Sequence, residues 1–216
     1  MFKTVTATDG HSFACWMEPA QGVRRGGLVI LQEIFGVTDQ LKGVARQYAA
    51  QGIEVAIPAL FDRQERDAVI PFDQGARGRA LMLASDLEAT MRDVAAAVAA
   101  LGGPVAVMGF CWGGGLALRA AQVLDIACGV SFYGTSLPRY LDKPLVKPMQ
   151  GHFGLSDDHT PPEVLAQVRA AMPGFGMHLY EAGHAFANDA RPASYVAGAA
   201  ELAHERTAAF LAQHLG

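Results

Sequence analysis

The chain has 216 residues, of which 51% are hydrophobic, and it carries a formal net charge of −4 at pH 7. This composition favours one compact domain over residues 1–216 and excludes a disordered or fibrous chain. Because lysine and arginine form no cluster, neither nucleic acid nor a membrane surface is an expected partner.

The chain opens with two short stretches that read as strands, residues 3–7 and residues 13–17. The first alternates polar and apolar residues, and the second is almost wholly apolar. Asp9 and Gly10 lie between them, and this dipeptide is typical of a tight hairpin turn. We therefore predict an N-terminal β-hairpin.

Beyond the hairpin, continuous apolar runs alternate with longer amphipathic stretches. Such runs are typical of strands buried on both faces of a parallel sheet, and here they occupy residues 27–31, 53–57, 105–108, 126–132, 146–152 and 177–180. The intervening segments predict helices over residues 38–51, 76–101, 114–123, 162–172 and 193–215. Pro161-Pro162 is a plausible start signal for the fourth of these. The alternation predicts a doubly wound α/β fold with a mostly parallel central sheet and helices on both faces.

Residues 61–78 form the least regular segment, which is charged and interrupted by proline and glycine. A long connection after a strand of an α/β sheet lies over the carboxyl edge, where ligands bind. A solvated surface loop explains the composition equally well. Both interpretations stay open.

The strongest chemical signal is Gly109-Phe110-Cys111-Trp112-Gly113, which follows an apolar run and precedes a helical segment. This is the strand–turn–helix context of a nucleophile elbow, with cysteine in the place of serine. The helix N-terminus behind Cys111 favours negative charge on its sulfur. The alternative is a glycine-rich turn with an inert, buried cysteine. Cys15 and Cys128 lie inside apolar strand candidates and are expected to pack in the core.

A cysteine nucleophile needs a base and a group that orients the base. Hydrolases with a nucleophile elbow place these in the order nucleophile, acid, histidine. Asp157 in Gly154-Leu155-Ser156-Asp157 and His184 both follow predicted strands, so both belong at the same sheet edge as Cys111. Asp158 competes for the acid role, and His159 is a candidate for the pocket rim.

The remaining histidines are expected to have structural or surface roles rather than catalytic ones. His152 and His178 fall in strand runs, where a buried and hydrogen-bonded role is expected. His11, His204 and His214 are interpreted as surface residues.

Glu33 follows the first central strand in Leu31-Gln32-Glu33-Ile34-Phe35-Gly36. This loop donates one oxyanion-hole N–H in α/β-hydrolases, and the residue after the nucleophile donates the other. The expected donors are therefore the backbone amides of Ile34 and Trp112. A charged Glu33 near Cys111 would disfavour the thiolate. A hydrogen bond between them would hold the thiol neutral until substrate moved the carboxylate. A surface or salt-bridged glutamate is the alternative, and the pattern alone does not separate the two.

Four segments resemble the dienelactone hydrolase (carboxymethylenebutenolidase) family of the α/β-hydrolase superfamily. They are LQEIFGV at 31–37, GFCWGG at 109–114, GLSD at 154–157 and YEAGHAF at 180–186. The resemblance implies a Cys111–His184–Asp157 triad, with Glu33 holding the resting thiol and accepting its proton. It also implies hydrolysis of an enol lactone to a dicarboxylic acid in the breakdown of chlorinated aromatics, without a metal or an organic cofactor.

The chain departs from that family at the substrate carboxylate. Family members hold it with two arginines, one of which lies four residues after the catalytic histidine, where this chain has Asn188. Arg77 or Arg79 is the candidate for the second. Losing a bidentate clamp weakens selection for an anionic substrate. Phe35, Phe132 and Tyr133 are expected to line an apolar pocket.

The sequence thus predicts a hydrolase of a small ester or lactone. A carboxylesterase or thioesterase acting on a neutral substrate is the first alternative. A catalytically silent binding protein on the same scaffold is the second.

The expected surroundings of this enzyme follow from what the sequence lacks. The N-terminal segment has no apolar core like that of a signal peptide, and no apolar stretch reaches the roughly 20 residues that span a bilayer. Three cysteines are an odd number, which argues against a disulfide-stapled secreted scaffold. We therefore expect a cytoplasmic protein, as a monomer or a small homo-oligomer.

Overall fold

A computed structural model describes residues 1–216. The chain forms two compact units, residues 1–105 together with Leu215, and residues 106–214 together with Gly216. Each unit has its own strands and covering helices. No helix combines the length and the apolarity needed to cross a bilayer.

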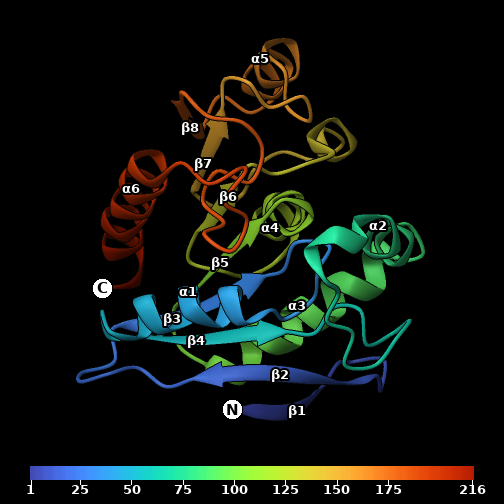
Figure 1. Ribbon diagram of the computed structural model, residues 1–216. Coiled ribbons are helices and arrows are strands. Elements are labelled where there is room, and N and C mark those ends of the chain that lie inside the picture. The colour runs from blue at the N-terminus through green and yellow to red at the C-terminus, as the bar shows by residue number, and fades with distance from the viewer. The chain divides into compact units, whose positions relative to one another are not determined.

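The strands of the first unit lie in the order β1-β2-β4-β3 (Figure 1). Their bounds are β1 (Phe2–Thr6), β2 (Ser12–Glu18), β3 (Gly26–Leu31) and β4 (Ile53–Pro58). β1 and β2 pair antiparallel, as do β2 and β4, whereas β3 and β4 are parallel. The predicted hairpin is confirmed, and Gly10 has the positive φ of 86° that its turn requires.

The helices of the first unit are α1 (Asp39–Ala49), the short η1 (Phe72–Gln74), α2 (Gly75–Leu83) and α3 (Leu87–Leu101). The prediction of one helix over residues 76–101 is wrong. The Asp86 side chain accepts the Ala89 N–H at 2.7 Å, so it caps a new helix and ends the old one. Thr38 caps α1 in the same way.

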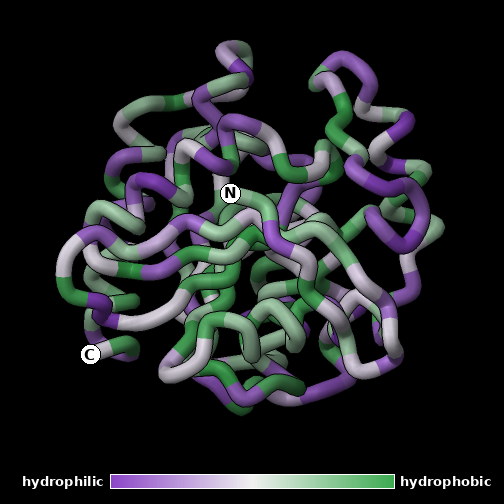
Figure 2. Tube along the Cα trace, turned by 90° about the horizontal axis from the view of Figure 1, so that it is seen from below, coloured by the Kyte–Doolittle hydropathy of each residue, from purple (hydrophilic) through white to green (hydrophobic).

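The core of the first unit forms where α1 and α3 pack on β4. Every residue of β3 is buried, as expected of a strand covered on both faces. Figure 2 shows the inner strand traces mostly in green, and hydrophilic residues in purple gather in outer loops and helices. Apolar burial of this kind is the main stabilising term for the unit.

The second unit contains four strands in the order β5-β6-β7-β8, and each pairs parallel with its neighbour. They are β5 (Val105–Phe110), β6 (Gly129–Phe132), β7 (Met149–Gly154) and β8 (Phe175–Tyr180). β6 and β7 each begin three residues later than predicted. In β7 the delay follows from Pro148, which has no N–H for the ladder.

Helices cover both faces of these four strands, with α6 on one side and α4 and α5 on the other (Figure 1). The elements are α4 (Trp112–Val123), the short η2 (Leu137–Tyr140), α5 (Pro162–Ala171) and α6 (Ala197–Leu215). α6 begins four residues later than predicted. Successive side chains of a strand point to opposite faces of the sheet. Phe132 accordingly packs on His204 of α6, whereas the neighbouring Ser131 faces Gly114 of α4. The eight strands and their helices confirm the α/β class.

Candidate active site

Cys111 lies at a sharp turn between β5 and α4. Its backbone has φ 53° and ψ −116°, a conformation that is rare for a residue with a side chain. Strain of this kind persists where surrounding contacts hold it. The Cys111 carbonyl accepts N–H groups from Gly114 and Thr135, both at 3.0 Å, and the Cys111 N–H donates to Phe132 at 3.0 Å. Cys111 therefore has the backbone geometry of a nucleophile elbow, with a half-buried side chain.

The glycines around Cys111 allow three backbone segments to approach one another. A Cβ on Gly109 would collide with the carbonyl oxygen of Gly113, and a Cβ on Gly114 would lie 2.6 Å from the Cα of Gly134. Gly134 and Thr135 follow β6, and the sequence interpretation missed both. A glycine directly after a predicted central strand was the available signal.

Asp157 and His184 form a hydrogen-bonded pair. Nδ1 of His184 lies 2.8 Å from Oδ2 of Asp157, and the other carboxylate oxygen accepts the N–H of His159 at 2.9 Å. Asp157 is 2% exposed, whereas neighbouring Asp158 is exposed. Burial raises the pKa of Asp157, but the bond and charge of His184 outweigh it, so the pKa stays below the ordinary value. Asp157 is thus ionised, and its carboxylate can orient the ring of His184.

Strand order places these groups at one edge of the second unit. Cys111, Asp157 and His184 each follow the carboxyl end of a strand, β5, β7 and β8 respectively, and all neighbouring strands are parallel. Tyr133, directly after β6, packs its ring 5.2 Å from His184 and 6.0 Å from Phe110. The strand ends therefore bring the nucleophile candidate and the acid–base candidates to the same edge.

His159 and Ala185 complete the surroundings of His184. The rings of His159 and His184 lie 4.5 Å apart, which agrees with a place for His159 at the rim. Ala185 has a positive φ of 61°, so the turn that carries His184 is also strained. The side chain of His184 remains 20% exposed, which leaves its imidazole accessible from solvent.

Five predicted site residues belong to the first unit and are described there. Glu33 and Phe35 are buried just after β3, and Phe35 packs edge-on against Phe72 at 4.8 Å. Ile34 follows Glu33, and its carbonyl oxygen lies where a side chain at Gly78 of α2 would be. Arg77 and Arg79 are exposed on α2. Arg77 forms an ion pair with Glu65, so its charge already has a partner.

Other predicted residues of the second unit have structural contacts. Phe132 is fully buried among Phe110, His152 and His204, with ring centroids 4.7 to 4.8 Å away, which gives it a core role. Asn188 is buried, and its side-chain oxygen accepts the N–H of Ala190 at 3.1 Å. Trp112 begins α4 and is almost fully buried.

Two histidines where α6 packs on the strands, His152 and His204, have structural contacts. His152 is buried and bonds Tyr180, as expected for a strand residue. The expectation that His204 lies at the surface is wrong, because its ring packs on the aromatic core and burial lowers its pKa to about 4. No group of three or more His, Cys, Asp or Glu side chains is arranged to hold a metal ion.

Comparisons with known proteins agree with this architecture. The model of the dienelactone hydrolase family matches residues 13–215. A carboxymethylenebutenolidase of Pseudomonas putida is 34% identical, over 97% of this chain and 94% of that protein. A second one, from Pseudomonas sp. strain P51, is 33% identical over 94% and 91%.

Solved structures show the same fold. A dienelactone hydrolase-like promiscuous phosphotriesterase from metagenomic libraries superposes with a TM-score of 0.79 at 20% identity, covering 100% of this chain and 99% of that one. An esterase of Pyrococcus furiosus superposes with a TM-score of 0.72 at 14% identity, covering 100% and 93%. The predicted α/β-hydrolase fold is therefore confirmed.

Proposed function

Because the chain belongs to the dienelactone hydrolase family and is thereby a hydrolase of carboxylic esters or lactones, we propose that Cys111, His184 and Asp157 carry its reaction. The observation that supports this most is the strained turn at Cys111, at the same strand edge as a buried Asp157 bonded to His184. A core cysteine needs neither the positive φ nor a histidine–aspartate pair nearby. The match over residues 13–215 also supports one domain over residues 1–216.

The proposed reaction has two halves. In the first, the sulfur of Cys111 bonds to the substrate carbonyl carbon while the thiol proton passes to His184. The tetrahedral intermediate then expels the alcohol oxygen, which takes that proton, and a thioester remains on Cys111. In the second half, His184 takes a proton from water, and the resulting hydroxide attacks the thioester. Collapse releases the carboxylic acid and returns the proton to the sulfur.

Asp157 positions and stabilises the base in both halves. Its carboxylate holds Nδ1 of His184 at 2.8 Å, which leaves Nε2 for proton transfer. The N–H of Trp112, the first residue of α4, is the oxyanion donor that we propose within the second unit. The roles of Glu33 and Ile34 stay predictions from the sequence.

A neutral ester or thioester is the second candidate substrate class, and two contacts favour it over an anionic lactone. Arg77 forms a surface ion pair with Glu65, and Asn188 uses its side-chain oxygen to hold a turn. Asn188 has no guanidinium to bind a carboxylate in a bidentate manner, and the guanidinium of Arg77 is already engaged with Glu65, which leaves Arg79 as the other candidate. We therefore expect weaker selection for dienelactone than for a short uncharged ester.

The test measures hydrolysis of dienelactone and of p-nitrophenyl butyrate by the wild type, Cys111→Ala and Cys128→Ala. Cys128→Ala is the matched control, because it removes a fully buried thiol from another part of the unit. We expect Cys111→Ala to lose at least roughly a thousandfold in kcat/KM on every substrate turned over. A mass spectrum of quenched wild type should show one acyl group, which Cys111→Ala lacks.

Each result bears on a different part of the proposal. Full activity in Cys111→Ala overturns the triad. Turnover of the ester alone keeps the triad and selects the neutral substrate class. If neither substrate is turned over and small electrophiles do not label Cys111, the result counts against the triad and favours the alternative of a binding protein on a hydrolase scaffold.

A further inference from the structure

Two rings lie against the imidazole of His184. The ring of Tyr133 is 5.2 Å away at an interplanar angle of 69°, and the ring of His159 is 4.5 Å away at 55°. Tyr133 is fully buried, whereas His159 is exposed. The imidazole thus has one neighbouring ring in the core and one at the surface.

The buried ring is held by the sheet. Tyr133 has a positive φ of 38°, and its N–H donates to the carbonyl of His152 in β7 at 2.7 Å. Its ring also packs edge-on against Phe186, with 5.5 Å between the centroids. A strained backbone persists only where the surrounding contacts hold it. Tyr133 is therefore a fixed neighbour of His184.

The exposed ring is carried by a turn that Asp157 itself forms. Oδ1 of Asp157 accepts the N–H of His159 at 2.9 Å, and the Asp157 carbonyl accepts the N–H of Thr160 at 3.1 Å. An aspartate that bonds the backbone two residues further on makes a stable turn. Oδ2 of the same carboxylate lies 2.8 Å from Nδ1 of His184. One carboxylate thus holds the first imidazole and the turn that brings the second against it.

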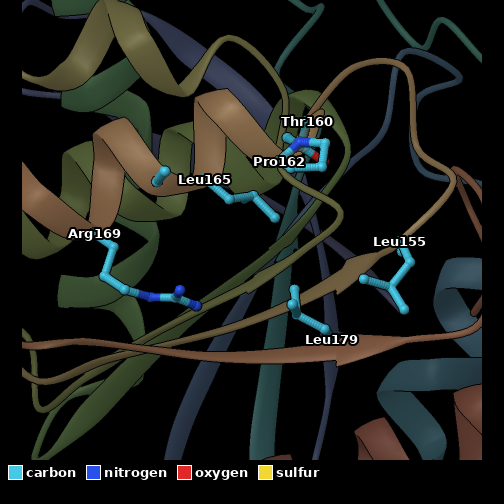
Figure 3. Close-up of a pocket in the computed structure, with 8 residues that line it drawn as sticks. Leu155, Thr160, Pro162, Leu165, Arg169 and Leu179 are labelled. Atoms are coloured by element: carbon cyan, nitrogen blue, oxygen red, sulfur yellow. The ribbon is translucent and has the colours of Figure 1, made fainter.

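This turn is also anchored on both sides of Asp157. Leu155 and Thr160 both line the apolar hollow formed by residues of α5, β7 and β8 (Figure 3). Pro161-Pro162 follows at the start of α5 and restricts the backbone there. His159 therefore lies on a short and constrained loop, although its side chain is exposed.

The bond to Asp157 alone does not fix the plane of the His184 ring, because a hydrogen bond tolerates a range of angles. The side chain of His184 is 20% exposed, so packing does not enclose it completely. A general base must direct its free nitrogen at the proton that it takes, and a misplacement of about 1 Å can cost up to a hundredfold in rate. Contacts with the ring of His184 supply the constraint that the hydrogen bond lacks.

We propose that His159 is a positioning residue for His184, whose ring it holds in the plane that proton transfer at Nε2 requires. This role rests on the proposed function, in which His184 is the base. The role needs an aromatic ring at residue 159. Because the site is exposed, histidine suits it, since its ring has an apolar body and a polar tip.

The test compares three variants with the wild type. His159→Phe keeps a ring, His159→Gln keeps a planar polar group without a ring, and His159→Ala keeps neither. All three retain the backbone N–H that Asp157 accepts, so the turn is preserved.

We expect kcat to fall about tenfold in His159→Ala and His159→Gln on every substrate turned over, with KM within about twofold of the wild type. His159→Phe should keep kcat within about threefold. Ser156→Ala is the control, because it shortens an exposed, uncharged side chain of the same loop, and it should leave kcat unchanged.

A second readout needs no turnover. The proton that His184 shares with Asp157 gives a downfield signal in proton NMR, and His184→Gln identifies this signal by removing it. Without the covering ring, the proton should exchange faster with water. The signal should therefore broaden in His159→Ala and His159→Gln and stay sharp in His159→Phe. The amide signal of His159 or of its replacement, together with Tm, shows that the loop is intact.

Equal kcat and equal line widths in all variants overturn the positioning role. Activity in His159→Gln but not in His159→Phe overturns it as well, because polarity and not the ring is then required. A rise in KM for one substrate alone would make His159 a substrate contact instead. If the wild type turns over neither substrate, the proposed function fails, and the line widths still decide whether the ring of His159 holds His184.

Discussion

Two buried aspartates, one in each unit, differ in the kind of side chain that binds them. Asp93 in α3 is 1% exposed and receives two hydrogen bonds from Arg63, at 2.6 and 2.7 Å. Asp157 is 2% exposed and is bonded to His184. Arg63 keeps its charge at every physiological pH, whereas the imidazole of His184 can give up and take a proton.

The position of each pair in its unit explains the difference. Asp93 lies in the middle of a helix, and its partner Arg63 lies in the segment after β4. Asp157 lies on a loop just past β7, where a substrate can reach its partner. Burial of a paired carboxylate therefore does not mark a catalytic site by itself. In the proposed triad, the titratable partner of Asp157 is the feature that sets it apart from Asp93.

The largest effect is expected for Asp157→Asn. The amide preserves the shape but no longer stabilises the imidazolium, and it can hold His184 in the wrong tautomer. We expect kcat to fall by roughly a thousandfold or more, with a small change in Tm. The control is Asp158→Asn, since Asp158 is exposed beside it, and equal activity in the two variants would remove Asp157 from the mechanism.

Arg63→Met should have the next largest effect, on stability rather than on activity. It leaves Asp93 buried without its cation, which should lower the free energy of unfolding by about 3 kcal/mol at pH 7. Urea denaturation measures this change. Burial already raises the pKa of Asp93, so the variant should recover part of its stability at pH 4, where the carboxyl is protonated. Adding Asp93→Leu should restore most of the loss, and failure to do so would show that Arg63 acts elsewhere.

Between pH 7 and pH 5, the free energy of unfolding should fall because of histidines in the second unit. Burial lowers the pKa of His204 to about 4 despite the charge of Asp189. The unfolded chain therefore binds the proton first, and stability declines as pH falls below about 6.5. For His204 alone we expect about 2 kcal/mol by pH 5, measured by urea denaturation.

His152 and His178, whose pKa values are also lowered by burial, act in the same direction. His204→Phe should flatten the curve in part. If lowering the pH accelerated amide exchange in α3 of the first unit as much as in the second unit, the assignment of this pH dependence to the second unit would be contradicted.

The smallest effect is expected for Arg92→Gln, next to the Arg63 pair. Arg92 bonds Asp9 at 2.9 Å, but the two side chains are 40% and 27% exposed, so solvent screens the pair. We expect a change in Tm of about 1 °C or less by calorimetry, and less still at high salt. A loss as large as that of Arg63→Met would mean that the whole charged cluster acts as one unit.

The sequence predicted the strands well, because buried parallel strands are continuous apolar runs. It failed at Asp86, since good helix formers on both sides conceal a cap that ends one helix and begins another. It also failed at His204, whose aromatic neighbours belong to strands far away in the sequence. Such partners are decided by packing and leave no local pattern.

The candidate site was predictable to a similar extent. Cys111, Asp157 and His184 each follow a strand, so their order and positions were visible, and the hydrogen bond between Asp157 and His184 agrees with that interpretation. The pairing of Arg77 with Glu65 and the close approach of Gly134 were not visible, because each depends on a segment distant in sequence.

The three cysteines have a practical consequence. Cys15 and Cys128 are fully buried, and burial raises the pKa of each thiol to about 12. Cys111, in contrast, has a half-buried side chain at the elbow. A mild alkylating reagent should therefore attach one label to each native chain, and the extent of labelling counts the competent molecules in a preparation. The same chemistry provides a single built-in point for a fluorophore or a spin probe, without any engineered residue.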